Sequence, residues 1–219
     1  MKKYFVMLVA IVSFTVNTYA GGSFGIKGAY TYGGLKAKIC TIKTGGISTS
    51  KDYSSTSEME HPKGFGGELF CDIGIPLLPL GVEIGAGFYT ENFKEIAGDI
   101  TTTYTVNSIK FSGLGKYYTK GIPIILPWIG LGPFIGLNTH NVATTILGET
   151  ITITGNMVPN FGLTIGTGIK IGILPKVAVN LGMLLDYYLV SEATSNSGAI
   201  TTEWTYSQWN LNTMVGISF

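Results

Sequence analysis

Few residues of this 219-residue chain could do chemistry. Its two histidines are His61 and His140, and its two cysteines are Cys40 and Cys71. A metal site needs a convergent set of His, Cys or carboxylate ligands, and His61 has only two nearby glutamates in a polar segment. No phosphate-binding loop and no Cys-x-x-Cys motif is present. The sequence therefore predicts no catalytic residues, no metal site and no cofactor, and we do not expect an enzyme.

The composition excludes several classes of protein. Charged residues are 12% of the chain, about half of the ~25% that is usual in soluble proteins. All 14 basic residues are lysines and the net charge is +1, so the chain has no basic field for nucleic acid. With 45% hydrophobic residues it is too apolar to be disordered. The 31 glycines and the low charge favour a β protein or a membrane protein.

The N-terminus has the pattern of a targeting signal. Lys2 and Lys3 precede an apolar run over residues 4–14, and Thr18 and Ala20 are small residues at the −3 and −1 positions of a cleavage site. A retained membrane anchor is the alternative, but the run is short of the ~20 residues that a spanning helix needs. We predict a signal peptide over residues 1–20, cleaved after Ala20, and export of the rest.

Apolar residues alternate with small or polar ones along most of the exported chain, which is typical of β-strands. In the segment 161–172, for example, Phe161 and Leu163 share one face, and Gly162 and Thr164 share the other. Seven segments follow this pattern: 24–32, 65–75, 82–88, 129–137, 161–172, 177–189 and 209–219.

An eighth strand is expected within residues 102–118. Tyr104 and Val106 are out of phase with Ile109, so we expect a β-bulge near Asn107. A second irregularity is expected at Pro133, because proline inside a closed barrel implies a bulge or a missing ladder bond.

The connections between these segments alternate in length. Short, proline-containing links lie at 76–80, 119–127 and 173–176, and longer polar links at 34–63, 91–101, 139–158 and 191–202. Short turns at one end and long loops at the other are typical of an outer-membrane barrel. We therefore predict an all-β fold over residues 21–219: an eight-stranded, antiparallel, up-and-down transmembrane β-barrel with both ends of the domain on the short-turn side.

The second face of the strands is too poor in charge to be a solvated exterior, so we assign it to the barrel interior. Its ionisable residues are expected to form a paired, structural polar network: Lys27, Glu68, Asp72, Glu83, Lys110, Lys170 and Asp186. The opposite face is expected to contact lipid, for example at Tyr30, Leu69, Ile84, Ile165 and Leu181. Aromatic residues near the strand ends suggest two interfacial belts: Tyr30, Tyr32, Phe88, Tyr187, Trp204 and Trp209 at the long-loop end, and Phe24, Tyr117, Trp128 and Phe219 at the other.

The two cysteines are not expected to form a disulfide, although the exported compartment is oxidising. Pairing the first two strands places Cys71 about level with Lys27, far along the first strand from Cys40. At ~3.3 Å per residue the offset is on the order of 40 Å, well beyond the reach of a disulfide.

The chain resembles a known family, the small eight-stranded outer-membrane barrels of OmpA-like and OmpX-like type. Residues 108–136, SIKFSGLGKYYTKGIPIILPWIGLGPFIG, resemble the fourth strand, short turn and fifth strand of these proteins. The C-terminal WNLNTMVGISF is similar to their assembly signal, with Phe219 terminal and Val215 and Ile217 alternating before it. The resemblance implies a location in the outer membrane of a Gram-negative-type bacterium, with outer-membrane lipids and the barrel assembly machinery as partners.

The resemblance specifies fold and location better than function. A structural or surface-interaction role through the long loops is the first hypothesis, with an unknown loop partner and a monomeric state. A narrow channel for small or amphipathic solutes is the alternative. An outer-membrane lipid-modifying enzyme is less favoured, because the lipid A deacylases use a His-x-Ser pair and Val142 stands two residues after His140. A soluble ligand-binding barrel conflicts with the charge-poor faces and with the terminal Phe219.

Overall fold

The computed structural model describes residues 22–44, 47–52, 61–97, 100–119, 124–146, 149–155, 157–174, 176–190, 192–197 and 200–219. The expected signal peptide lies outside these residues. Within the described part of the chain, we find no helix with the length and hydrophobicity needed to cross a membrane.

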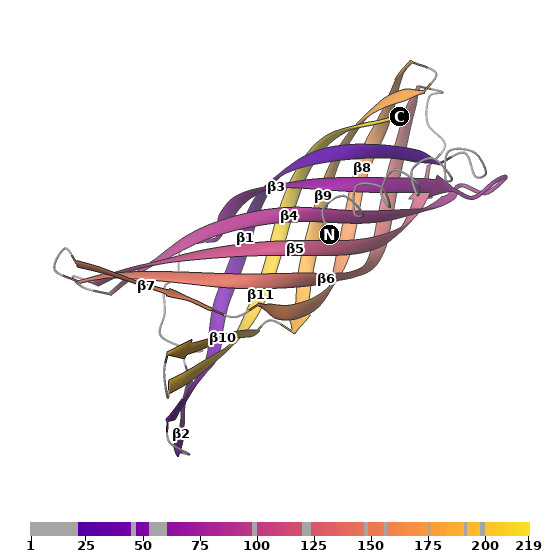
Figure 1. Ribbon diagram of the computed structural model, residues 1–219. Coiled ribbons are helices and arrows are strands. Elements are labelled where there is room, and N and C mark those ends of the chain that lie inside the picture. The colour runs from indigo at the N-terminus through magenta and orange to yellow at the C-terminus, as the bar shows by residue number, and fades with distance from the viewer. Residues whose placement is uncertain are drawn as a thin grey trace, which may run out of the picture.

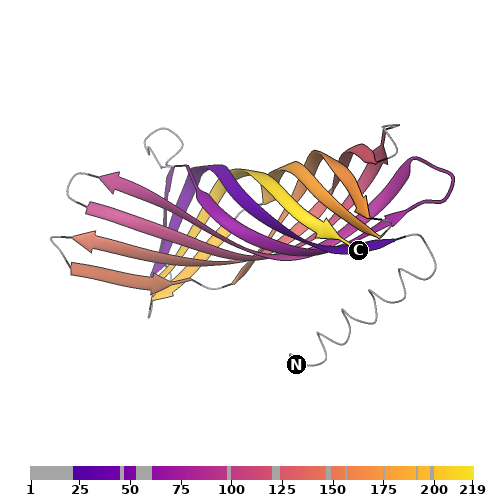
Figure 2. The same cartoon turned by 90° about the horizontal axis from the view of Figure 1, so that it is seen from above.

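The described residues form one antiparallel sheet that closes on itself (Figures 1 and 2). Its strands are β1 Ser23–Thr44, β2 Ile47–Asp52, β3 Lys63–Gly74, β4 Leu80–Ala97, β5 Ile100–Tyr118, β6 Ile125–Ile146, β7 Glu149–Thr154, β8 Val158–Leu174, β9 Val177–Val190, β10 Glu192–Ser197 and β11 Ile200–Ser218. Eight of them make the barrel wall in the order β1-β3-β4-β5-β6-β8-β9-β11, and β11 pairs with β1 to close it. The predicted eight-stranded, up-and-down antiparallel barrel is therefore confirmed.

The two ends of the barrel differ, as the link lengths predicted. The backbones of Phe24 and Phe219 exchange two hydrogen bonds, of 2.7 and 3.1 Å, so the first and last strands meet at the short-turn end. At the same end, the turn between β3 and β4 is closed by a 2.8 Å bond from the N–H of Ile75 to the carbonyl of Leu80.

The long polar links, by contrast, contain more β structure than we expected. The segment 91–101 is not a loop: β4 and β5 remain paired up to the partners Ala97 and Ile100. The short strands β2, β7 and β10 pair with the far ends of β1, β6 and β11, respectively. These hairpins project from one end of the barrel (Figure 2). The Thr- and Ser-rich sequences of β2 and β10 lack the alternation that predicts a strand.

The prediction of a β-bulge near Asn107 is wrong. Asn107 pairs with Thr90 on one side and with Thr139 on the other, with no register shift in either ladder. Val106 is buried, and Tyr104 stacks on buried Phe93 with 4.7 Å between ring centroids. The phase change therefore arises because the interior is apolar at this height of the barrel, and the strand itself is regular.

Pro133 does interrupt one ladder. Strands β5 and β6 pair from Ser112 with Phe134 and again from Gly115 with Leu131, in the same register, and the described ladder has no pairs between these points. Proline has no N–H to donate, so of the two expected irregularities a missing ladder bond is found here and a bulge is not. The backbones are close at this point, since a Cβ on Gly132 would lie 1.7 Å from the carbonyl oxygen of Gly113.

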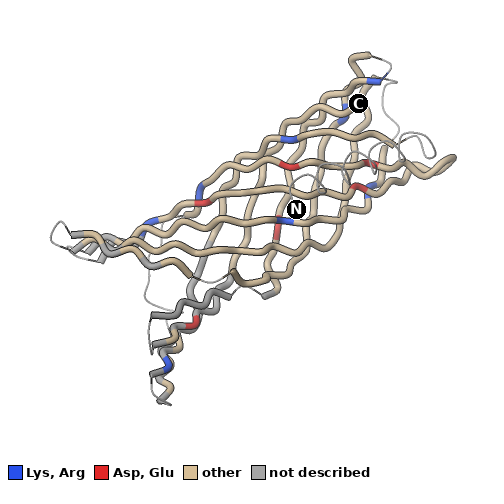
Figure 3. Tube along the Cα trace, viewed as in Figure 1, with Lys and Arg blue, Asp and Glu red and all other residues tan. Residues whose placement is uncertain are grey.

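The outer surface of the barrel is apolar, and charged residues are sparse along its strands (Figure 3). Ile84 and Ile165 are more than half exposed, and Tyr30 and Leu69 are also exposed, while Leu181 is partly exposed on the same face. This arrangement is the reverse of a soluble barrel and is that of a barrel in lipid.

Most of the described belt aromatics lie on this outer face. Exposed members are Tyr30, Phe88, Tyr117, Tyr187, Trp209 and Phe219. The prediction that Trp128 belongs to the short-turn belt is wrong. Its side chain is 5% exposed and points into the barrel, because the outward positions of β6 are the odd-numbered ones. The side chain of Trp204 lies outside the described set.

Candidate functional site in the barrel interior

A first polar network fills the interior near the short-turn end. Lys27 of β1 contacts Glu83 of β4 and lies 3.7 Å from Glu68 of β3. Lys116 of β5 lies 2.5 Å from the other oxygen of Glu83 and 3.7 Å from Asp72. All of these side chains are almost completely buried.

Asp72 also joins the remaining members of this network. The hydroxyl of Tyr118 donates to both of its oxygens, at 2.7 and 2.6 Å. Lys170 of β8 lies 3.7 Å from it and donates to the Ser23 hydroxyl at 2.8 Å. We call this set of Lys27, Glu68, Asp72, Glu83, Lys116, Tyr118 and Lys170 the short-turn network.

A second network lies toward the long-hairpin end. Lys110 of β5 lies 2.5 Å from Asp186 of β9, which also accepts bonds from Thr164 at 2.5 Å and Asn212 at 2.7 Å. Glu91 of β4 is buried nearby. It accepts bonds from Asn210 at 2.6 Å and from Gln208 at 3.4 Å. We call the set of Lys110, Asp186, Thr164, Asn212, Glu91, Asn210 and Gln208 the long-hairpin network.

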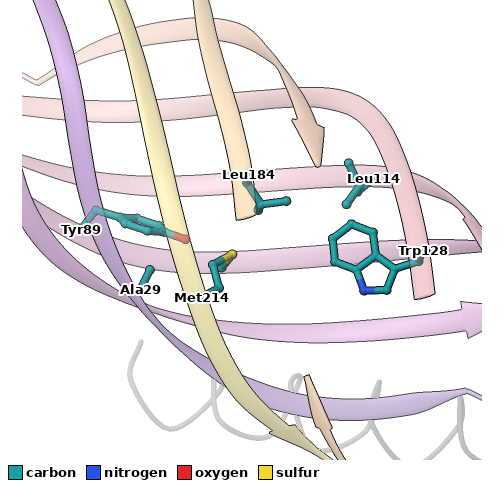
Figure 4. Packing of buried hydrophobic residues seen from close by; sticks show 6 residues of the cluster. All are labelled: Ala29, Tyr89, Leu114, Trp128, Leu184 and Met214. Carbon is teal, nitrogen blue, oxygen red and sulfur yellow. The ribbon is translucent and has the colours of Figure 1, made fainter. Parts of the chain in front are cut away.

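Buried hydrophobic residues occupy the level between the two networks: Ala29, Tyr89, Leu114, Trp128, Leu184 and Met214. Figure 4 shows how these six side chains lie inside the barrel. The order along single strands shows the layering. On β5, Leu114 lies between Lys110 and Lys116, and on β4, Tyr89 lies between Glu83 and Glu91.

Aromatic rings join this apolar layer to the charged groups. The ammonium group of Lys116 lies 4.4 Å from the Trp128 ring, and that of Lys110 lies 4.7 Å from the Phe134 ring. The hydroxyl of Tyr89 donates to Glu68 at 2.9 Å. Cation–π contacts of this kind are strongest where water is excluded, so the layer and the lysines stabilise each other.

The interior leaves little free space around the layer. A small cavity beside Trp128, Lys27 and Lys116 has a volume of about 10 Å³. That is room for about one water molecule. Beside these three residues, pairing and packing thus leave little free space.

The structure places all seven ionisable residues that we assigned to the interior in one or other of these two networks, and it adds Lys116 and Glu91. Both could have been found by continuing the alternation. Lys116 has the same parity as Lys110 on β5, and Glu91 has the same parity as Glu83 on β4. The segment predicted at 82–88 stops short of Glu91, and Lys116 lies beyond the alternating residues Ile109 and Phe111.

The other candidate residues are dispersed. Cys71 is a free thiol. It lies level with Phe24, three residues from the register that we expected, and the side chain of Cys40 lies outside the described set. The His61 ring lies at the long-hairpin end, 5.1 Å from the Tyr32 ring. His140 pairs through its backbone with Val106.

Comparison with known proteins gives matches to solved structures only. No protein-family model and no curated protein matches the chain. The outer membrane protein OprG from Pseudomonas aeruginosa matches with a TM-score of 0.58 and 15% identity, over 90% of this chain and 96% of that one. A major outer membrane protein from Thermus thermophilus matches with a TM-score of 0.52 and 13% identity, over 90% and 98% of the two chains. The chain thus has the fold of the small eight-stranded outer-membrane β-barrels that its sequence resembles.

Proposed function

We propose that this protein is an integral outer-membrane barrel that acts at the cell surface, through the hairpins that extend its strands, and not as an open channel. The filled barrel interior carries this proposal. Two buried polar networks and the apolar layer between them occupy the space in which a solute would have to pass.

The lengths of the strands support a role outside the membrane. Strands β1, β4, β5, β6 and β11 have 18 to 22 residues. A tilted strand crosses the hydrocarbon core with about 9–11 residues. About half of each strand is therefore available to project beyond the lipid, where it supports the hairpin tips.

The channel alternative has less support. A water-filled path requires a continuous lumen, as in the larger porins, whereas an eight-stranded interior is just wide enough for side chains to fill it. Opening such a path would separate Lys110 from Asp186 and Lys116 from Glu83, all of which are buried. Breaking buried pairs of this kind is costly, so a conducting state is disfavoured.

Epitope tags on intact cells test this proposal. One tag is inserted between Ile146 and Glu149, in the β6–β7 hairpin, and a matched tag is placed between Leu174 and Val177, in a short turn. We expect antibody to label the first tag on intact cells and the second only after the outer membrane is permeabilised. Labelling with the opposite pattern, or of neither tag on intact cells, would contradict the proposed surface role.

A further inference from the structure

The outer wall of the barrel carries a lysine pair above an apolar groove, on strands β1, β3, β4, β5 and β6. Lys63 of β3 and Lys94 of β4 are both exposed and face outward. Lys63 pairs with Asn92 in the β3–β4 ladder, so Lys94 is its diagonal neighbour, about 7–8 Å away between Cα atoms. Two flexible ammonium groups at this spacing can bind one phosphate together.

The described outward-facing residues around this lysine pair carry no negative charge. No acidic residue is found among the described outward-facing positions of β1, β3, β4 and β5, because Glu91, Glu83 and Glu68 all point inward. The outward neighbours of the pair are the polar or aromatic side chains of Tyr32, Asn92 and Thr105. The lysines therefore lack a protein counter-ion on this face within the described residues.

The groove begins below the lysines and runs across the apolar wall. It has a volume of about 1090 Å³. Its floor is hollow at Gly67, Ala86 and Gly113, where large side chains are absent, and Leu69, Phe88 and Phe111 project at its sides. A Cβ on Gly113 would meet nothing within 4 Å, and one on Gly67 would come no closer than 3.8 Å to another atom.

Both features match one kind of molecule, and we propose that this wall binds a phosphorylated glycolipid of the lipid A type from the outer leaflet. Lys63 lies four residues from Gly67, or roughly 13 Å along the strand. That separation suits a headgroup phosphate above and an acyl chain in the groove. Lipid A is the favoured source because the lysines lie at the long-hairpin end, which rests on the surface orientation proposed above.

Native mass spectrometry of the refolded barrel in detergent can measure this binding. The probes are diphosphoryl lipid A and monophosphoryl lipid A. We expect the diphosphoryl form to bind more tightly, and each of Lys63→Gln and Lys94→Gln to weaken its binding about fivefold. Lys176→Gln, at an exposed lysine near the short turns, is the matched control and should leave binding unchanged.

Filling the groove with a side chain tests the role of the groove in lipid binding separately from that of the two lysines. Gly113→Leu places a side chain in the groove, whereas Gly115→Leu, two residues along the same strand, lies outside the groove lining. We expect only Gly113→Leu to weaken lipid A binding. Equal binding by wild type, the Lys63→Gln/Lys94→Gln variant and Gly113→Leu would overturn the lipid site, even if the tags show the proposed surface orientation. Reversed tags would instead overturn the orientation, whatever the lipid result.

Discussion

Lys110 of β5 and Asp186 of β9 are 76 residues apart in sequence and meet inside the barrel, with 2.5 Å between Nζ and Oδ2. Strands β6 and β8 separate them in the wall, so the pair crosses the interior and ties two sides of the barrel together. Lys110→Met leaves the Asp186 carboxylate buried without its cation. We expect a loss of about 3–5 kcal/mol in the free energy of unfolding, measured by urea titration in lipid vesicles.

Two further variants separate charge from packing at this pair. Replacing both residues, Lys110→Met with Asp186→Leu, removes both buried charges and should restore much of the loss. Lys43→Gln breaks the exposed pair with Glu203, whose side chains are 50% and 43% exposed, and should cost less than about 1 kcal/mol. Similar losses for Lys110→Met and Lys43→Gln would show that the interior pair is not buried in the membrane-embedded barrel.

Gly132 and Gly113 face each other where the β5–β6 ladder is interrupted. A Cβ on Gly132 would lie 1.7 Å from the Gly113 carbonyl oxygen, whereas a Cβ on Gly113 would meet nothing within 4 Å. We therefore expect Gly132→Ala to lower the yield of folded barrel strongly and Gly113→Ala to leave it unchanged. Heat-modifiable mobility on gels measures this yield, and equal yields would refute the close approach of the two strands.

Ile165 and Lys170 lie on opposite faces of β8. Ile165 is 59% exposed on the apolar wall, so Ile165→Lys should cost about 2–4 kcal/mol in a vesicle-embedded barrel. Lys170→Gln should cost less, because the Lys170 side chain is partly exposed at its rim position and an amide can still donate to Ser23. Equal losses in urea titrations would contradict the assigned faces.

Phe219 directly follows β11, the strand that closes the barrel, and its backbone pairs with that of Phe24. We propose that it also acts in assembly, together with Val215 and Ile217 of the same outward face. Deleting Phe219 should lower the amount of barrel in the outer-membrane fraction, and Phe219→Trp, which keeps an aromatic ring, should preserve most of it. An unchanged amount after the deletion would rule out an assembly role.

Much of this fold could be predicted because one physical rule dominates it. In a barrel with lipid outside, alternation fixes which face each residue takes, and this rule placed Lys27, Glu83 and Asp186 correctly in the interior. The rule is uninformative where both faces are apolar. Trp128 and Leu184 both belong to the interior layer, but Trp128 has apolar neighbours, and the sequence pattern predicts it to be a belt residue.

The strand extensions were missed for a different reason. The hydrophobic alternation that predicts a strand is absent from the polar sequences of β2 and β10. Their pairing comes from backbone hydrogen bonds to β1 and β11, which the sequence pattern does not encode. The contact between Glu91 and Asn210 across the barrel could not be predicted either, because alternation assigns each residue to a face but does not say which inward residues meet.

The most direct test of the closed interior is single-channel recording of the refolded wild-type protein in planar lipid bilayers. The paired charges and the layer around Trp128 predict insertion without stable conductance steps, and the loss of side-chain volume in Trp128→Ala/Leu114→Ala predicts small steps under the same conditions. Insertion is verified independently by protease protection of the spanning strands. Regular, ohmic conductance steps from the inserted wild-type protein would contradict the account and support a channel.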